Sequence, residues 1–327
     1  MAAITLLQAI NQALDQAMAN DERVVVYGED TGFEGGVFRV TAGLQKKYGE
    51  ARVFDTPISE STIAGAAIGM AINGLLPVAE IQFDGFIFPA LTDLVTHAAR
   101  FRNRSRGQYS VPMVLRVPHG GGIRALEHHS ESIEMFVASV PGLKVVTPST
   151  PYDAKGLLLA AINDPDPVIY LEPKKIYRAG RQEVPEESYQ IPLGKAKVVK
   201  PGTDITVVSW GALVRMVEKA ALEVAKEGIS VEVIDLRTLV PYDKETLIQS
   251  VKKTGKFMVV TEAVKSYGPA SELIAMINEE AFYHLEAAPV RFTGFDITVP
   301  LARGEHYHYP SEEKIISYLR KLYLAKP

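Results

Sequence analysis

The sequence predicts an α/β protein of two domains, each with a mostly parallel sheet covered by helices. Its 327 residues are too many for one ordinary core and suit two domains of about 150 residues each. In the first half, short β-rich runs alternate with segments of helical periodicity, which is typical of a parallel sheet with helices on its faces. The alternation stops at a charged, proline-containing stretch and then resumes, which predicts a second and smaller α/β unit.

The expected elements follow in order along the chain. The first segment, MAAITLLQAINQALDQAMAND, has the apolar spacing of an amphipathic helix and offers Thr5 as its cap. Strands are expected at 23–28, 52–56, 76–83, 111–118, 143–148, 167–173, 204–211, 229–238, 255–262 and 288–296. Helices of the second half are expected near 212–227, 243–253, 268–280 and 311–323. We therefore expect an N-terminal domain over 1–178, a linker over 179–202 and a C-terminal domain over 203–327.

Composition and charge exclude several classes of protein. The 35 basic and 39 acidic residues leave a net charge of −4, so the chain lacks the electrostatic footprint of a nucleic-acid partner. The absence of cysteine removes disulfides and thiolate zinc sites and fits the reducing cytoplasm, where we expect the protein. The N-terminus lacks the basic start and continuous apolar run of a signal peptide. The uncharged stretch 61–79 is interrupted by Asn73, Gly74 and Pro77, so a helix, a turn and a strand explain it better than a membrane span.

The stretch FDTPISESTIAGAAIGMAI, residues 54–72, places one carboxylate, Glu60, at the start of an apolar helix. A carboxylate gains there from the helix dipole and the free amides, so a structural role is enough to explain it. Gly65 and Gly69 lie one turn apart and would let another helix or a flat ligand approach closely. Packing, including packing between subunits, explains that face equally well.

The strand expected at 76–83 leads into EIQFDGFIFPA, which offers Glu80 and Gln82 as polar groups and Phe83 and Phe86 as aromatic ones. Open α/β sheets bind ligands at the carboxyl ends of their strands. Aromatic residues at this spacing also fit a core. The stretch is therefore a candidate wall of a ligand site, with core packing as the alternative.

The segment HGGGIRALEHHSES, residues 119–132, concentrates glycine and polar residues in a loop. Three consecutive glycines can adopt conformations that cradle an anion. The adjacent His128 and His129 point in different directions, which disfavours a shared metal and favours proton transfer. A second pair, His306 and His308, fits a surface turn.

Common cofactor motifs are missing from the sequence. It has no Walker loop, no GxGxxG after a strand, no GxSxG elbow and no acidic motif for a diphosphate with its metal. A charged cofactor bound to this chain would therefore need half of its site from elsewhere.

Several stretches together resemble one protein family. They are VVVYGEDTGFEGGVF, FDTPISE, PVAEIQF, HHSES, PGLKVVTPSTPYDAKGLLLAAINDPDPVIYLEPK and VIDLRTLVPYD, and they are similar to the beta chain of the first component of the 2-oxo acid dehydrogenase complexes. The resemblance implies a thiamine diphosphate enzyme built as an alpha-two beta-two heterotetramer. This chain would supply a pyrimidine-binding parallel-sheet domain and a transketolase-like C-terminal α/β domain. The family's alpha chain carries the motif for Mg²⁺ and the diphosphate, which accounts for its absence here.

The resemblance also implies roles for individual residues. Glu60 matches the glutamate that hydrogen-bonds the ring nitrogen of the cofactor's aminopyrimidine and favours the imino tautomer, whose nitrogen removes the thiazolium proton. Ile58, Gln82 and Phe86 match positions around the aminopyrimidine, with Phe86 as a stacking wall. His129 matches a histidine at the mouth of the active site, implicated in substrate handling and reductive acylation of the lipoyl group.

The segment AINDPDP resembles a potassium site of the same family. Asp164 is the candidate side-chain ligand, and backbone carbonyls near Ala161, Asp166 and Met113 are the others. Hard oxygen ligands of this kind suit such an ion.

The implied reaction is decarboxylation of a 2-oxo acid and transfer of the acyl group to a lipoyl arm of the core acyltransferase. The implied partners are the alpha chain and the lipoyl and subunit-binding domains of that acyltransferase, with neither nucleic acid nor a membrane. We favour pyruvate over branched-chain oxo acids, and acetoin cleavage is a third alternative. A different class of function is a mainly structural subunit that holds alpha chains together and docks them on the acyltransferase core.

Overall fold

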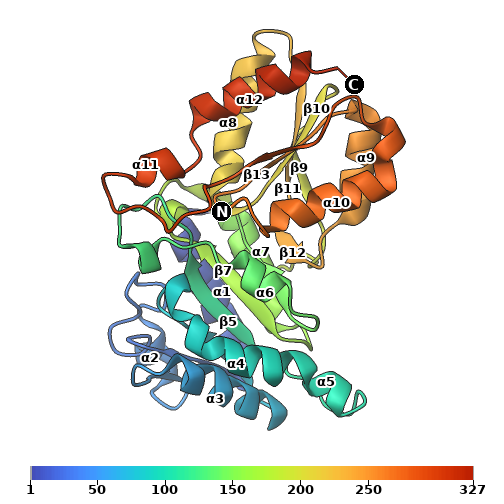
Figure 1. Ribbon diagram of the computed structural model, residues 1–327. Coiled ribbons are helices and arrows are strands. Elements are labelled where there is room, and N and C mark those ends of the chain that lie inside the picture. The colour runs from blue at the N-terminus through green and yellow to red at the C-terminus, as the bar shows by residue number, and fades with distance from the viewer. Residues whose placement is uncertain (1, 327) are drawn as a thin grey trace.

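Seven strands form the sheet of the N-terminal domain, in the lower half of Figure 1. The computed structural model describes residues 2–326. The sheet has the order β12-β6-β7-β5-β4-β2-β3, and its strands are β2 Val24–Gly28, β3 Val53–Asp55, β4 Leu76–Glu80, β5 Val114–His119, β6 Lys144–Val146, β7 Val168–Pro173 and β12 Thr238–Val240. All neighbours pair in parallel except β12 and β6. The carboxyl ends of six strands therefore meet at one edge of the sheet.

Helices cover both faces of this sheet. One face carries α1 Leu6–Asn20 and α7 Pro151–Ile162, and the other carries α3 Glu60–Ile72, α4 Phe88–Thr96 and α6 Glu134–Ala138. Two short α-helices, α2 Leu44–Tyr48 and α5 Phe101–Arg104, lie in connections. Three 3₁₀ helices lie near the carboxyl edge: η1 Asp84–Phe86, η3 Glu127–His129 and η4 Lys174–Ile176. Thr5 caps α1 as predicted, because its Oγ1 accepts the Gln8 N–H at 3.3 Å while Gln8 Oε1 accepts the Thr5 N–H at 3.0 Å.

Five strands form the sheet of the C-terminal domain, in the upper half of Figure 1. The order is β14-β13-β10-β11-β9, with β9 Lys197–Lys200, β10 Ile205–Ser209, β11 Val231–Asp235, β13 Phe257–Val260 and β14 Val290–Phe292. On one face α8 Val214–Ala225 packs against α12 Glu312–Leu324, and on the other α9 Lys244–Thr254 packs against α10 Pro269–Ala281. The short helix α11 Glu305–His308 lies on the long segment between β14 and α12. The predicted fold class is confirmed.

The two domains are interleaved rather than merely tethered. The segment expected as a linker contains β8 Gln182–Val184, which pairs with β1 Ala2–Ile4, and β9, which belongs to the second sheet. The run expected as one strand at 229–238 contains β11 of the second sheet and reaches β12 of the first. One apolar core includes Leu115 from β5 and Val208 from β10. The domain limits drawn from the sequence remain predictions, and no helix within residues 2–326 has the length and apolarity to cross a membrane.

Candidate active site

The residues expected at the site gather at the carboxyl edge of the first sheet. Ile58 and Glu60 follow β3, Gln82 and Phe86 follow β4, and His129 lies on the loop after β5. These strands run in parallel, so their ends meet where open α/β sheets bind ligands. The fold thus brings together positions that are far apart in the sequence.

Glu60 is the first residue of α3, and its carboxylate is uncommitted. The side chain is half-buried, and no described residue donates a hydrogen bond to it. Ile58, two residues earlier, is 83% exposed. A free carboxylate at a helix N-terminus beside an exposed apolar side chain is suited to a ligand or a partner that covers both.

Glu29 is a second acid at this edge, and sequence reasoning did not single it out. It directly follows β2, its side chain is 4% exposed, and its Oε1 has no hydrogen-bond partner among the described residues. Burial raises the pKa of Glu29, and the charge of Glu60 raises it further. Glu29 therefore holds a proton more readily than a glutamate in water does. The signal in the sequence was an acid directly after the buried run VVVYG.

Gln82 and Phe86 lie on the neighbouring strand connection. Gln82 Nε2 donates to Asp30 Oδ2 at 2.8 Å, which fixes the amide and leaves its carbonyl oxygen free to accept. The ring centroid of Phe86 lies 5.4 Å from that of His129 and 5.5 Å from that of His128. Phe86 therefore belongs to an aromatic cluster with the two histidines.

His129 packs edge-on against Phe83, with ring centroids 3.9 Å apart. Partial burial lowers the pKa of His129, and the positive charges of His128 and Lys174 lower it further. Its Nδ1 is buried and has no hydrogen-bond partner among the described residues. The lowered pKa favours the neutral imidazole of His129 at neutral pH.

The glycine triplet does cradle anions, and these anions are carboxylates of the same chain. The N–H groups of Gly120, Gly121 and Gly122 donate at 2.6, 2.7 and 2.6 Å to Asp84, Glu262 and Glu305 respectively. Each amide is thereby committed. The triplet thus binds carboxylates, as its sequence allowed, and folding supplies these acids from distant parts of the same chain.

Buried charges lie beneath this loop. His119 Nδ1 is 3.3 Å from Asp84 Oδ2, and His119 Nε2 is 3.3 Å from Glu134 Oε1. Burial alone lowers the pKa of His119, but Glu134 and Asp84 together outweigh it and raise the value to about 10. Lys174 Nζ donates to Asp84 Oδ1 at 3.1 Å and to the Pro118 carbonyl at 3.0 Å. The two cations, His119 and Lys174, thus pair with the two carboxylates, Asp84 and Glu134, and all four side chains are buried.

Glu80, offered by the sequence as a candidate ligand, belongs to another buried cluster. Arg116 on β5 is fully buried, with Nη1 2.6 Å from Glu80 Oε2 and Nε 2.6 Å from Glu172 Oε1. Tyr177 donates its hydroxyl to Glu172 Oε2 at 2.6 Å. The cluster links β4, β5 and β7 and is paired within the chain, so it supports the sheet beneath the site.

The carboxylates of the expected potassium site are paired with cationic side chains. Lys144 Nζ lies 2.6 and 2.7 Å from the two oxygens of Asp164, and an arginine pairs with Asp166. The carbonyls of Ala161 and Met113 each accept a backbone N–H. Within residues 2–326 no group of three or more His, Asp or Glu side chains could hold a metal. An ion here would depend mainly on backbone carbonyls, which have a second lone pair to offer.

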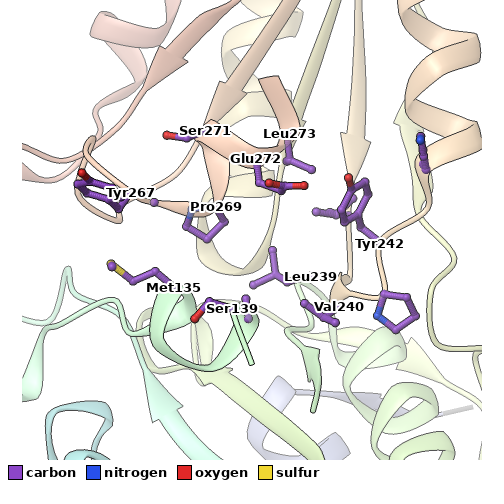
Figure 2. Close-up of a pocket in the computed structure, with 15 residues that line it drawn as sticks. Met135, Ser139, Leu239, Val240, Tyr242, Tyr267, Pro269, Ser271, Glu272 and Leu273 are labelled. Carbon is purple, nitrogen blue, oxygen red and sulfur yellow. The ribbon is translucent and has the colours of Figure 1, made fainter. Parts of the chain in front are cut away.

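An apolar groove of about 600 Å³ lies between the domains, away from these residues. Figure 2 shows Met135 and Ser139 of α6 facing Leu239 and Pro269 of the C-terminal half across this groove. None of the expected site residues lines it. The groove therefore does not belong to the candidate active site.

Two domain families match the chain. The transketolase pyrimidine-binding domain matches residues 2–180, and the transketolase C-terminal domain matches residues 194–315. A solved structure described as a split gene transketolase, inactive beta4 tetramer, matches over 100% of both chains with a TM-score of 0.81 and 21% identity, which shows a shared fold. The chain is therefore a two-domain protein of the transketolase class, and its candidate site lies at the edge of the pyrimidine-binding sheet.

Curated relatives narrow the class to one family. The chain is 78% identical to the pyruvate dehydrogenase E1 component subunit beta of Acholeplasma laidlawii over 327 residues, which is 100% of each chain. It is 53% identical to the subunit of that name in Mycoplasma genitalium over 320 residues, 97% of each chain. It is 50% identical to the subunit of that name in Bacillus subtilis over 322 residues, which is 98% of this chain and 99% of the relative. The chain belongs to the family of pyruvate dehydrogenase E1 beta subunits, which confirms the family resemblance of its motifs.

Proposed function

We propose that this chain is the beta subunit of a thiamine diphosphate-dependent pyruvate dehydrogenase, acting with an alpha subunit in an alpha-two beta-two heterotetramer. Pyruvate is the substrate named for its full-length relatives. The observation that carries the catalytic role is the free, half-buried carboxylate of Glu60 beside the exposed Ile58. The enzyme works in the cytoplasm, because a chain without cysteine needs no disulfides and fits a reducing compartment.

Open apolar surface around the site supports an alpha partner. Phe33, on the loop after β2, is 84% exposed, and Ile58 is 83% exposed. On α3, a Cβ added at Gly65 or Gly69 would meet nothing within 4 Å, so this small-residue face is unpacked within the chain. A partner that covers these positions would also bring the diphosphate and Mg²⁺ site whose motif this sequence lacks.

The residues at this edge fit the aminopyrimidine of thiamine diphosphate. When bound, the cofactor supplies the stabilised carbanion that decarboxylation requires. Glu60 holds or releases a proton at the ring nitrogen, and the buried Glu29 favours retention of a proton at this edge. Gln82 offers its free carbonyl oxygen, while Ile58 and Phe86 supply apolar surface that excludes water.

His129 acts in the second half of the reaction. Its lowered pKa keeps the imidazole neutral and able to accept a proton when the acetyl group moves to the lipoyl arm. His129 is half-buried, so part of its ring is open to a lipoyl group. A potassium ion, if bound, takes the carbonyls of Ala161 and Met113 rather than the paired carboxylate of Asp164.

Docking is a further part of this proposal. The C-terminal domain exposes aromatic side chains, with Phe282 at 59% and Tyr283 at 98% exposure. Exposed aromatic groups of this kind suit a protein partner, which we assign to the subunit-binding domain of the core acyltransferase. The docking role and the catalytic role are compatible, because they use different domains.

The proposal is tested by reconstitution. The alpha and beta chains are assayed together with pyruvate, a branched-chain 2-oxo acid and acetoin, and the beta chain is assayed alone with excess thiamine diphosphate and Mg²⁺. We expect the highest kcat/KM with pyruvate and no turnover by the beta chain alone. Decarboxylation by the isolated beta chain, or preference for another substrate, would contradict the proposal.

A further inference from the structure

The loop between β5 and α6, residues 120–133, is fastened by the other domain. Gly121 N–H donates to Glu262 Oε2 at 2.7 Å, and Gly122 N–H donates to Glu305 Oε1 at 2.6 Å. Glu262 follows β13, and Glu305 begins α11. Both acceptors thus come from the C-terminal domain, which reaches back to the loop by way of the long segment that carries α11 (Figure 1).

These contacts are buried, and they use three of the four carboxylate oxygens of Glu262 and Glu305. Glu305 is 5% exposed and Glu262 is 9% exposed. The second oxygen of Glu305 accepts the Arg124 N–H at 2.9 Å, so one carboxylate spans three residues of the loop. Hydrogen bonds to an ionised carboxylate are stronger than bonds between neutral groups, and more so when buried. The loop is therefore held by buried hydrogen bonds, which are charge-assisted where the accepting carboxylate is ionised; burial raises the pKa of Glu262 to about 7, so its bond to Gly121 is charge-assisted above that pH.

Glycine is required for this close approach. Gly120 and Gly122 both have φ of +81°, where residues with a side chain are strained. A Cβ on Gly120 would lie 2.6 Å from Glu262 Oε1, and a Cβ on Gly122 would lie 2.6 Å from Lys175 Cδ. Glycine at position 120 therefore leaves room for the Glu262 carboxylate, and glycine at position 122 leaves room for the Lys175 side chain.

The same loop determines where the two histidines lie. Asp84, on η1, accepts the Gly120 N–H, and η1 packs on the η3 turn that carries the histidines. A Cβ on Gly85 would clash with the carbonyl of His128, which shows how closely the two turns are packed. The ring of His129 rests on Phe83, the residue that precedes η1. Movement of the loop would therefore move His129.

We propose that Glu262 and Glu305 are positioning residues, which fasten the glycine loop so that His129 is held in place for acetyl transfer to the lipoyl arm. The second half of this statement rests on the function proposed above for His129. Glu262 and Glu305 touch neither substrate nor cofactor and act through the loop. The C-terminal domain thereby contributes to the chemistry at the edge of the N-terminal sheet.

Hydrogen exchange in the reconstituted heterotetramer tests the fastening directly. Amide exchange is followed by mass spectrometry in the peptide covering residues 119–126 for wild type, Glu262→Gln, Glu305→Gln and Glu305→Ala. We expect exchange in this peptide to rise about tenfold in Glu305→Ala and less in the Gln variants, since glutamine retains one oxygen acceptor. Glu280→Gln, an exposed acid of the same domain, is the control and should leave the peptide unchanged. Unchanged exchange in all three variants would overturn the proposal.

Kinetics separate positioning from a merely structural effect. Decarboxylation with an artificial oxidant should stay within about twofold of wild type, while acetylation of the lipoyl domain falls about tenfold in kcat with little change in KM. The positioning role is overturned if Glu305→Ala loosens the loop without slowing acetylation of the lipoyl domain, while His129→Ala does slow that acetylation. If the loop loosens and neither Glu305→Ala nor His129→Ala affects acetylation, the fastening is supported and the role proposed for His129 is the part that fails. Glu305→Gln keeps the test valid should an alanine variant not assemble.

Discussion

The carboxyl edge of the N-terminal sheet has an open side and a closed side. On the open side, Glu60 has no hydrogen-bond partner among the described residues and Ile58 is 83% exposed. On the closed side, the amides of Gly120–Gly122 all donate to carboxylates, and His119 lies between two acids. Both sides lie at the carboxyl edge of one sheet, the open side on the connection after β3 and the closed side on the connection after β5.

The difference indicates what each side is for. A buried polar group without a partner costs about 1 to 3 kcal/mol, so an unsatisfied acid such as Glu29 persists where a ligand or partner completes it. The closed side pairs most of its charges within the chain, although Glu134 Oε2 and Ser130 Oγ have no hydrogen-bond partner among the described residues. The open side is where we propose that the cofactor and the alpha chain bind, and the closed side is where we propose that His129 is held in place.

The largest expected effect, on the free energy of unfolding, comes from disrupting the buried Arg116 cluster that links β4, β5 and β7. Arg116→Met leaves Glu80 and Glu172 buried without their cation, and we expect a loss of about 3 to 5 kcal/mol in the free energy of unfolding. Arg320→Met, which removes an exposed pair with Glu227, is the control and should have little effect on the free energy of unfolding. Urea unfolding of the full chain measures both. Equal effects of the two substitutions would contradict the distinction between buried and exposed pairs.

Glu60→Gln tests the open side. It removes the ionisable group and keeps the shape, so decarboxylation by the heterotetramer should fall about 10²- to 10⁴-fold. Assembly should be unchanged by size-exclusion chromatography, since the side chain makes no hydrogen bond within the described chain. Glu50→Gln, an exposed acid of the same domain, should retain full turnover. Near-normal decarboxylation by Glu60→Gln would remove the catalytic role and leave the docking role.

His129→Ala tests whether the closed side serves the second half of the reaction. We expect acetylation of the lipoyl domain to fall about tenfold, with cofactor affinity by calorimetry within about twofold of wild type. His128→Ala is the matched neighbour and should have a smaller effect. A collapse of cofactor affinity in His129→Ala would instead assign this residue to the cofactor site.

The smallest effect is a pH dependence of stability that comes from Glu262. Burial raises the pKa of Glu262 to about 7, although the charges of His119 and Lys174 and the Gly121 N–H oppose the shift. Because this pKa is higher in the folded chain than in the unfolded one, the folded state takes up a proton, and its stability falls as pH rises towards 7. Glu134 also faces Glu262 and adds to the shift.

A comparison of wild type with Glu262→Gln isolates this contribution. The Tm of wild type minus that of Glu262→Gln should decrease between about pH 5 and pH 8, because only wild type must hold a buried carboxylate at the higher pH. The other buried groups titrate in both proteins and cancel. A difference in Tm that is constant across this range, or that increases with pH, would contradict the raised pKa.

Sequence periodicity predicted most of the fold and failed where tertiary pairing decided. The alternation of β-rich and helical runs gave the class, and Thr5 marked the start of α1 correctly. The run at 229–238 was expected to be one strand, yet its end forms β12 in the other domain's sheet. Local patterns record that a segment is extended, but they do not record which sheet it joins.

Positions of the candidate site could be proposed from motifs, whereas contacts between distant segments could not. Glu60, Gln82 and His129 were proposed from the family resemblance, and the structure places them at one sheet edge, while their roles stay predictions. Nothing local to HGGG indicates that its amides bind Glu262 and Glu305, which are 141 and 183 residues away from Gly121 and Gly122. Such long-range partners become visible only when the chain has folded.

The sequence by itself determined the class of fold and the family, because each of these leaves local signals in spacing or motif. The tertiary structure decided which polar groups remain free. Glu60 is free because no donor within the chain reaches the start of α3, whereas the glycine amides are committed because the C-terminal domain brings carboxylates to them. Hydrogen-bond partners are chosen by proximity in space, and proximity between distant segments is a property of the whole fold.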